Sequence, residues 1–87
     1  LNNWNVANVT YMNSMFSYAN SFNQDLSNWN VSNVTYMVSM FYQASAFNQD
    51  LSNWCVSNIP TMPTEFNTGA PFLVGANLPV WGTCPAP

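Results

Sequence analysis

Hydrophobic and polar positions along this chain follow a pattern that recurs at a fixed interval. Trp4, Trp29 and Trp54 are equally spaced, and residues 4–28 are identical to residues 29–53 at 19 of 25 positions. A fixed period of this length indicates one supersecondary unit stacked on copies of itself. We therefore predict a repeat protein in which neighbouring coils bury their apolar faces against each other.

Two different periodicities follow one another inside the middle repeat. Trp29 and Val31 alternate with Asn28 and Asn30, which predicts a short strand. The apolar residues that come next occupy positions i, i+3, i+4 and i+7, which predicts a short helix: Met37, Met40, Phe41 and Ala44. The expected fold is an α/β solenoid of right-handed, leucine-rich-repeat-like coils, with a parallel strand ladder on one side and short helices on the other.

The period divides the chain into four segments. Residues 1–25 and 26–50 form the first two repeat coils, residues 51–75 form a degenerate third coil, and residues 76–87 form a C-terminal cap. The recurring apolar positions predict the core, which comprises Leu1, Trp4, Val6, Met12, Met15, Phe16, Phe22, Leu26, Trp29, Val31, Met37, Met40, Phe41, Phe47, Leu51, Trp54, Val56, Met62, Phe66 and Phe72.

The third coil departs from the pattern in its predicted helix. Pro60 and Pro63 enter this segment, and proline is tolerated only in the first turn of a helix. Glu65 takes the place of the core methionine Met40, and a carboxylate is rarely buried without a partner. The third coil is therefore expected to end the stack. The first coil shows no such decay, so its outer face needs cover from upstream repeats of a longer precursor or from another subunit.

Composition and charge exclude several function classes. The chain has no Lys, Arg or His and only three acidic residues, so 3% of it is charged, against about 25% in an average domain. Binding to nucleic acid or to anionic membranes needs cations that are missing here. The sequence contains no run of 18 apolar residues, so no membrane span is predicted. Without His or Lys for acid–base chemistry, we expect neither an enzyme nor a cofactor.

Cys55 and Cys84 are the two cysteines, and both lie in the last third of the chain. Two cysteines are too few for a disulfide scaffold, and their spacing matches no zinc site. The sequence favours a disulfide that seals the C-terminal end, because Cys55 follows Trp54 and Cys84 follows Trp81 on what would be adjacent layers. The alternative is a pair of reduced, buried thiols.

Asp25 and Asp50 occupy equivalent turns in successive coils. Calcium binds six to eight oxygens, many of them carboxylates, so both are candidate calcium ligands. One Asp per turn is a sparse set of ligands, and capping of backbone amides in the turn is the favoured alternative.

Asn8, Asn30 and Asn33 begin N-x-S/T sequons and are candidate glycosylation sites. In a chain this rich in Asn, Ser and Thr, the same sequons also arise from composition alone.

A possible binding surface combines polar residues of the predicted strands with aromatic residues outside the buried stripe: Asn28, Asn30, Asn53, Tyr11 and Tyr36. Exposed aromatic patches are typical of interfaces and sugar-binding surfaces. Stacked asparagines also bond from layer to layer, and this structural interpretation is favoured for the Asn positions.

Residues 1–59 resemble the BspA-like surface-protein repeat, a 25-residue variant of the leucine-rich repeat. The residues that carry the resemblance are Trp29, Val31, Asn33, Val34, Met37, Met40, Phe41, Ala44, Phe47, Asn48, Gln49 and Asp50. The resemblance implies a secreted or surface-anchored array used for adhesion or binding, and it implies no catalytic activity.

The expected function is that of an extracellular or cell-surface structural or adhesive module, which self-associates into a larger assembly such as a fibre or sheath. Its expected partners are other copies of itself or upstream repeats. A second hypothesis is a domain that binds a glycan or a host surface protein through its Asn/Tyr face. A third is ice binding, although Thr10 and Thr35 supply only one Thr per coil.

Overall fold

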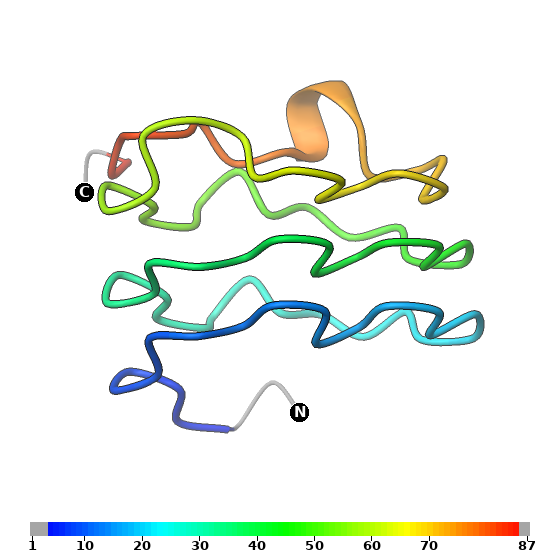
Figure 1. Cartoon of the computed structure of the whole chain (residues 1–87), viewed down its shortest axis with the longest axis horizontal. Coiled ribbons are helices and arrows are strands. Elements are labelled where there is room, and N and C mark those ends of the chain that lie inside the picture. The colour runs from blue at the N-terminus through cyan, green and yellow to red at the C-terminus, as the bar shows by residue number, and fades with distance from the viewer. Residues whose placement is uncertain (1–3, 86–87) are drawn as a thin grey trace.

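The chain runs through successive coils that lie one above another (Figure 1). The computed structural model describes residues 4–85. The blue first coil and the red C-terminal segment lie at opposite ends of the stack (Figure 1). The molecule measures 30 × 27 × 22 Å along its principal axes.

The predicted α/β solenoid, with its parallel strand ladder and short helices, is wrong. Residues 4–85 contain no α-helix and no β-strand. The regular structure in this part of the chain is one 3-10 helix, η1 (Gly75–Asn77), and one isolated parallel bridge between Tyr11 and Tyr36. The coils are built from consecutive turns instead.

The predicted helices are absent because backbone N–H groups alternate between two kinds of partner. The N–H of Phe16 donates to the carbonyl of Met40 in the next coil at 2.8 Å, and the N–H of Tyr18 donates to Tyr42 at 2.7 Å. Between them, the N–H of Ser17 closes a turn within the coil, onto the carbonyl of Ser14 at 3.1 Å. An α-helix would direct each of these groups to the carbonyl four residues earlier.

Residues in the left-handed conformation interrupt the same segments. Ser14 and Tyr18 have φ of 59° and 62°, and the equivalent Ser39 and Gln43 have φ of 57° and 59°. This conformation is unfavourable for residues other than glycine and does not continue a right-handed helix. The spacing i, i+3, i+4, i+7 therefore directs side chains inward here through turns and not through a helix.

The strand prediction was right about burial and wrong about the backbone. Trp29 and Val31 are buried and Asn30 is exposed. The N–H of Trp29, however, donates to the carbonyl of Leu26, and the N–H of Val34 donates to that of Val31, both at 3.0 Å within the coil. Local turns have therefore replaced a strand ladder.

Phe41 is the centre of an aromatic core that runs through all three coils. Its ring lies 5.3 Å from Phe16 of the first coil and 5.4 Å from Phe66 of the third, between ring centroids. Tryptophans extend this core. Trp29 lies 5.9 Å from Phe16, and Trp54 lies 6.5 Å from Phe41. Each of these tryptophans therefore packs on a phenylalanine of the coil before it.

Most of the predicted core is buried, together with positions that were not predicted. The buried apolar residues of residues 4–85 are Val6, Met12, Phe16, Leu26, Trp29, Val31, Val34, Met37, Met40, Phe41, Ala44, Phe47, Leu51, Trp54, Val56, Ile59, Phe66, Ala70 and Leu73. Phe22 is partly buried. Leu1, also a predicted core residue, lies outside the described residues.

Trp4 and Met15 were predicted in the core and are exposed. Trp4 is 57% exposed although its counterpart Trp29 is 3% exposed, and Met15 is 40% exposed against 0% for Met40. The second coil has a coil on each side, whereas the described part of the first coil has a neighbour on one side only (Figure 1).

Met62 and Phe72 are also exposed and not in the core, because the third coil contains one extra residue. The N–H of Ile59 bonds to Val56 as Val34 bonds to Val31, exactly one repeat earlier in the sequence. In the third coil, the N–H of Phe66 bonds to the carbonyl of Pro63. The equivalent bond of the second coil joins the N–H of Met40 to the carbonyl of Met37, so the two bonds are one repeat and one further residue apart in the sequence. The extra residue therefore lies between Ile59 and Pro63, and from Pro63 onward the sequence-based alignment is one residue out of register.

The shifted register explains the other anomalies of the third coil. Glu65, with φ of 55°, is the equivalent of Ser39 and not of the core Met40. Gly69, with φ of 77°, is the equivalent of Gln43, a position where the left-handed backbone suits glycine. Leu73 replaces Phe47 in the core, so the adjacent Phe72 points outward and is 51% exposed.

The two adjacent positions provide a direct test of this register. Leu73→Ala should lower the free energy of unfolding by about 2–5 kcal/mol, because it leaves a cavity in the core. Phe72→Ala should change it by less than about 1 kcal/mol, because its ring is half exposed. Urea denaturation of both variants measures the difference, and a larger loss for Phe72→Ala would restore the unshifted alignment.

Candidate functional site

The outer side of the first coil is the largest departure from a closed core. We call it the open face and define it by the apolar side chains that are not buried although their counterparts in the second coil are: Trp4, Val9, Met15, Ala19 and Phe22. The counterparts are all buried: Trp29, Val34, Met40, Ala44 and Phe47. The same residue types in the same repeat are therefore covered in one coil and uncovered in the other.

Backbone and amide donors border the open face. In the second coil, the N–H groups of Thr35 and Tyr36 both donate to the carbonyl of Thr10, at 2.9 and 3.4 Å. The equivalent N–H groups of the first coil belong to Thr10 and Tyr11, and neither makes a hydrogen bond within residues 4–85. An unpaired edge of this kind is a template for pairing with another chain segment.

The opposite end of the stack is covered by the C-terminal segment. The N–H of Leu51 donates to Asn77 and the N–H of Val56 donates to Thr83, both at 2.9 Å. Trp81 packs edge-on against Phe66, with centroids 4.9 Å apart. The third coil therefore has its cover within this chain.

A disulfide between Cys55 and Cys84 fixes this cover, with the two Cα atoms 4.1 Å apart. Cys55 stands where the earlier coils have Asn5 and Asn30, whose side-chain oxygens accept the N–H two residues on, at 3.1 Å in each case. The third coil has thus replaced a turn-capping asparagine by a covalent link to the C-terminal segment. The sequence favoured this disulfide but did not reveal what it replaces.

The predicted binding surface is only partly assembled. Tyr11 and Tyr36 stack with centroids 4.7 Å apart and planes 5° apart, and they are 66% and 47% exposed. Asn28, Asn30 and Asn53 are exposed, but none of them makes a hydrogen bond to either tyrosine within residues 4–85. Because each tyrosine ring covers one face of the other, the outer face of Tyr11 is the one directed away from the second coil.

Asn33 and Asn58 bond from coil to coil, as the sequence favoured, but to backbone carbonyls and not to each other. Asn33 donates from Nδ2 to the carbonyl of Ala7 at 2.7 Å, and Asn58 donates to that of Ser32 at 3.0 Å. Both bonds therefore link an amide to the backbone of the coil before it. Asn8, the equivalent of Asn33 in the first coil, has no such partner within residues 4–85.

The three sequons therefore differ in their surroundings. Asn33 uses its side-chain nitrogen between coils, as described above. Asn30 accepts the hydroxyl of Ser32 through Oδ1 at 2.6 Å, and its side-chain nitrogen has no partner within residues 4–85. Asn8 is exposed. Glycosylation of any of the three stays a prediction.

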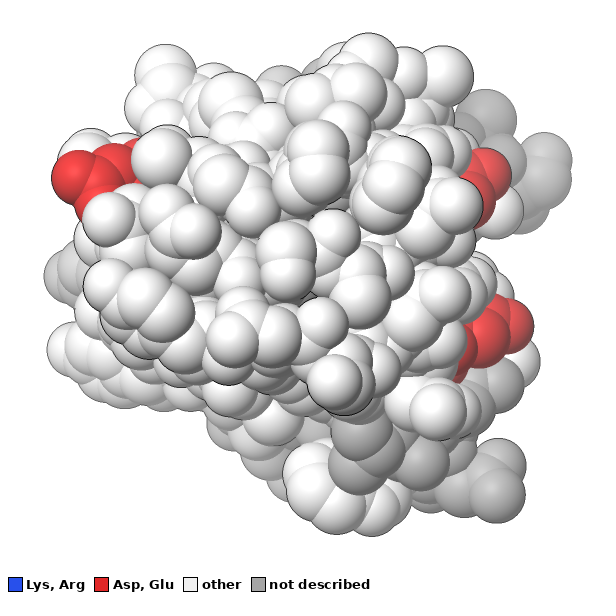
Figure 2. All heavy atoms as spheres, turned by 90° about the vertical axis from the view of Figure 1, so that its right-hand side faces the viewer, with Lys and Arg blue, Asp and Glu red and all other residues white. Residues whose placement is uncertain are grey.

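Asp25 and Asp50 cap turns. Oδ1 of Asp25 accepts the N–H of Ser27, and Oδ1 of Asp50 accepts that of Ser52, each at 2.9 Å. Hydrogen bonds from Ser27, its backbone N–H first, lower the pKa of Asp25, and hydrogen bonds from Ser52 lower the pKa of Asp50. Residues 4–85 hold no group of three or more His, Cys, Asp or Glu side chains that could bind a metal ion. On the face shown in Figure 2, the acidic side chains form small, separate patches.

These two pKa shifts predict a pH dependence of stability. Since the folded-state pKa lies below the ordinary value of 3.8, each carboxylate contributes stability above that value and loses it as the pH falls through the folded-state pKa. The double variant Asp25→Asn/Asp50→Asn keeps the capping oxygen, as Asn5 and Asn30 do. Its urea midpoint should fall less than that of the parent between about pH 5 and pH 2. An unchanged acid dependence would contradict this assignment.

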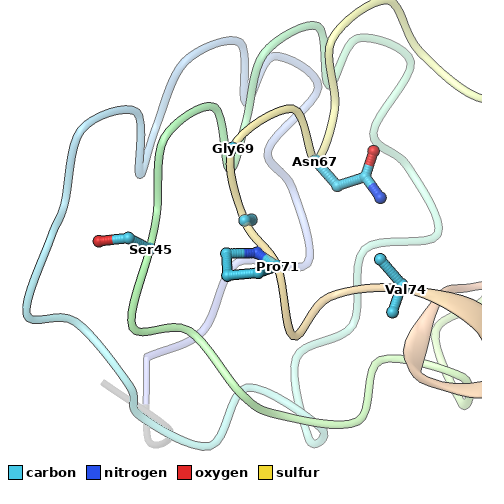
Figure 3. Close-up of a pocket in the computed structure, with 6 residues that line it drawn as sticks. Ser45, Asn67, Gly69, Pro71 and Val74 are labelled. Atoms are coloured by element: carbon cyan, nitrogen blue, oxygen red, sulfur yellow. The ribbon is translucent and has the colours of Figure 1, made fainter.

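A shallow hollow of about 570 Å³ lies beside the third coil (Figure 3). It is lined by Ser45, Asn67, Gly69, Ala70, Pro71 and Val74. Asn67 donates from Nδ2 to the carbonyl of Leu73 at 2.8 Å, so its amide is already engaged. No charged side chain lines the hollow, and nothing in the repeat pattern indicated it, because five of its six lining residues lie beyond the register shift.

The geometry thus defines a stack of repeated coils with one open and one covered end. The chain belongs to the family described as "Mycoplasma protein of unknown function, DUF285", whose match covers residues 1–78. No curated protein and no solved structure matches the chain. Within residues 4–85, no helix has the length and apolar character needed to cross a membrane. The disulfide is compatible with an extracellular or surface location.

Proposed function

We propose that this chain is an extracellular structural or adhesive module, of the BspA-like surface-repeat kind, that associates with further coils of its own type through the open face. The observation that carries the proposal is the contrast between identical residues in successive coils. Trp4 and Met15 are exposed, whereas Trp29 and Met40 are buried by neighbouring coils. A further coil on the open face would bury Trp4 and Met15, just as neighbouring coils bury their counterparts in the second coil.

The packing between coils indicates what such a partner has to supply. Trp29 packs on Phe16 of the coil before it, and Trp54 packs on Phe41. By analogy, Trp4 would pack against an aromatic side chain of a partner coil. The side-chain amide of Asn8 and the backbone N–H groups of Thr10 and Tyr11 would donate hydrogen bonds to carbonyl oxygens of the partner coil. Their counterparts in the second coil donate to carbonyl oxygens of the first coil in the same way. The expected partners are therefore other copies of the chain or upstream repeats.

The competing functions have less support in the geometry. Sugars stack on exposed aromatic ring faces, but Tyr11 and Tyr36 each use one face for the other. Thr10 and Thr35 are the equivalent threonines that could order water. The hydroxyl of Thr35 donates instead to the backbone carbonyl of Thr10, at 3.3 Å. Neither observation favours a glycan platform or an ice-binding surface.

An adhesion assay tests the proposal. Microspheres coated with the purified, oxidised chain should cluster in suspension, and microspheres coated with Trp4→Asp should stay dispersed because a carboxylate enters the apolar contact. Val80→Asp is the matched control, since Val80 is 63% exposed on the covered end of the stack, and it should cluster like the parent. Dispersal of the parent microspheres would contradict an adhesive role.

A further inference from the structure

Tyr11 and Tyr36 are a pair of exposed, oxidisable side chains that the proposed function does not use. Their ring centroids are 4.7 Å apart and their planes lie within 5° of parallel. Both rings are exposed, so a one-electron oxidant in solution has access to each of them. Oxidised phenols are radicals that combine with each other through their rings, and a stacked pair needs no diffusion to do so.

We propose that Tyr11 and Tyr36 are a site of oxidative coupling, at which a dityrosine bond joins the first coil to the second. Each phenol loses one electron and its hydroxyl proton, and the two phenoxyl radicals form a bond between ring carbons ortho to the oxygens. The hydrogens on those two carbons then move to the oxygens as protons, which restores both aromatic rings. The oxidant is hydrogen peroxide acting through a haem peroxidase. It takes up the two electrons and two protons and becomes two molecules of water.

The backbone holds the two rings in register. Tyr11 and Tyr36 are paired in a parallel bridge, so their side chains leave neighbouring segments on the same side. The N–H of Met12 donates to the carbonyl of Tyr36 at 2.8 Å, which fixes the two attachment points. Exposed side chains change rotamer within nanoseconds, so both rings are free to close the remaining gap and to turn edge to edge as the bond forms.

This site does not depend on what lies against the outer side of the first coil. The second coil has a neighbour on each side (Figure 1), and Tyr36 is still 47% exposed. A further coil would place Tyr11 between two neighbours, as Tyr36 is now. The ring face that meets Tyr36 would remain in contact with it.

Tyr18 and Tyr42 provide an internal comparison, because they also join the first coil to the second. Their centroids are 5.4 Å apart, but their planes are 80° apart, and Tyr42 is partly buried. A bond between ring carbons forms through π orbitals, which extend from the ring faces. An edge-on pair directs one such face at its partner, whereas a stacked pair directs two. The stacked pair is therefore the one that should couple.

The bond would act as a covalent staple between coils. At the covered end, the Cys55–Cys84 disulfide already joins the third coil to the C-terminal segment. Within residues 4–85, the first and second coils are joined by noncovalent contacts alone. A cross-link between Tyr11 and Tyr36 closes a loop of one repeat and restricts the unfolded chain. The coupled chain should therefore unfold at a higher urea concentration than the parent.

Treatment of the dilute chain with a haem peroxidase and limiting hydrogen peroxide tests the proposal. The parent should develop dityrosine fluorescence and stay monomeric on a denaturing gel. Because the chain has no Lys or Arg for trypsin, pepsin digestion replaces tryptic digestion. Mass spectrometry should then find Tyr11 and Tyr36 in a joined pair of peptides that lacks two hydrogen atoms.

Phenylalanine variants keep the rings and remove the reactive oxygen. Tyr11→Phe and Tyr36→Phe should each lower the yield of intramolecular dityrosine by about tenfold or more, because the tyrosines that remain have no partner held face to face. The matched control is the double variant Tyr18→Phe/Tyr42→Phe, which should couple like the parent. The chain has no tyrosines besides these four, so the variants cover every pair.

The contrary outcomes are equally specific. A parent that forms no intramolecular dityrosine, or a yield that persists in Tyr11→Phe, would overturn the proposal. A bond located between Tyr18 and Tyr42 would show that stacking does not select the site, and would also overturn it. A coupled chain that unfolds at a lower urea concentration than the parent would contradict a staple between coils. Thermal unfolding of each untreated variant at the midpoint of the parent establishes that a loss of coupling is not a loss of folding.

Discussion

The structure depends on a backbone hydrogen-bond pattern that divides the N–H groups of each coil into two sets. One set closes turns within the coil, as Ser17 does onto Ser14, and the other set reaches the next coil, as Phe16 does to Met40 and Phe41 does to Phe66. Backbone polar groups buried away from water need partners. Within residues 4–85 they find them without an α-helix or a sheet, because each coil repeats the path of its neighbour.

This arrangement makes every coil depend on the coils beside it. The second coil is complete because it has neighbours on both sides, and Met37, Met40 and Phe47 are fully buried. The first coil contains nearly the same sequence, yet Trp4 and Met15 are exposed. Cover by a neighbour, and not residue type, therefore decides whether a position belongs to the core. The proposed association through the open face is a consequence of that dependence.

The sequence was sufficient to predict the period, the inward-facing positions of the middle coil and the pairing of the cysteines. These features follow from burial and repetition, which composition and spacing record directly. The backbone was not predictable in this way, because Met37, Met40, Phe41 and Ala44 would face inward from a helix as well as from the turns that the structure contains. Left-handed residues such as Ser39 and Gln43 determine the difference, and neither residue type signals that conformation in advance.

The candidate site shows the same division between what was and was not predictable. The exposed Tyr11 and Tyr36 could be named from the sequence, but their stacking on each other depends on contact between coils. The extra residue between Ile59 and Pro63 moved Phe72 out of the core and brought Leu73 in. A register shift of one residue leaves the amino-acid pattern almost unchanged, so it became visible only from the hydrogen bonds.

Through-hydrogen-bond scalar couplings between amide nitrogen and carbonyl carbon, measured by NMR on labelled protein, test this hydrogen-bond pattern most directly. We expect correlations from the nitrogen of Phe16 to the carbonyl carbon of Met40, and from the nitrogen of Phe41 to the carbonyl carbon of Phe66. Correlations from the same nitrogens to the carbonyl carbons of Met12 and Met37, four residues earlier, would reveal helices and contradict hydrogen bonding between the coils.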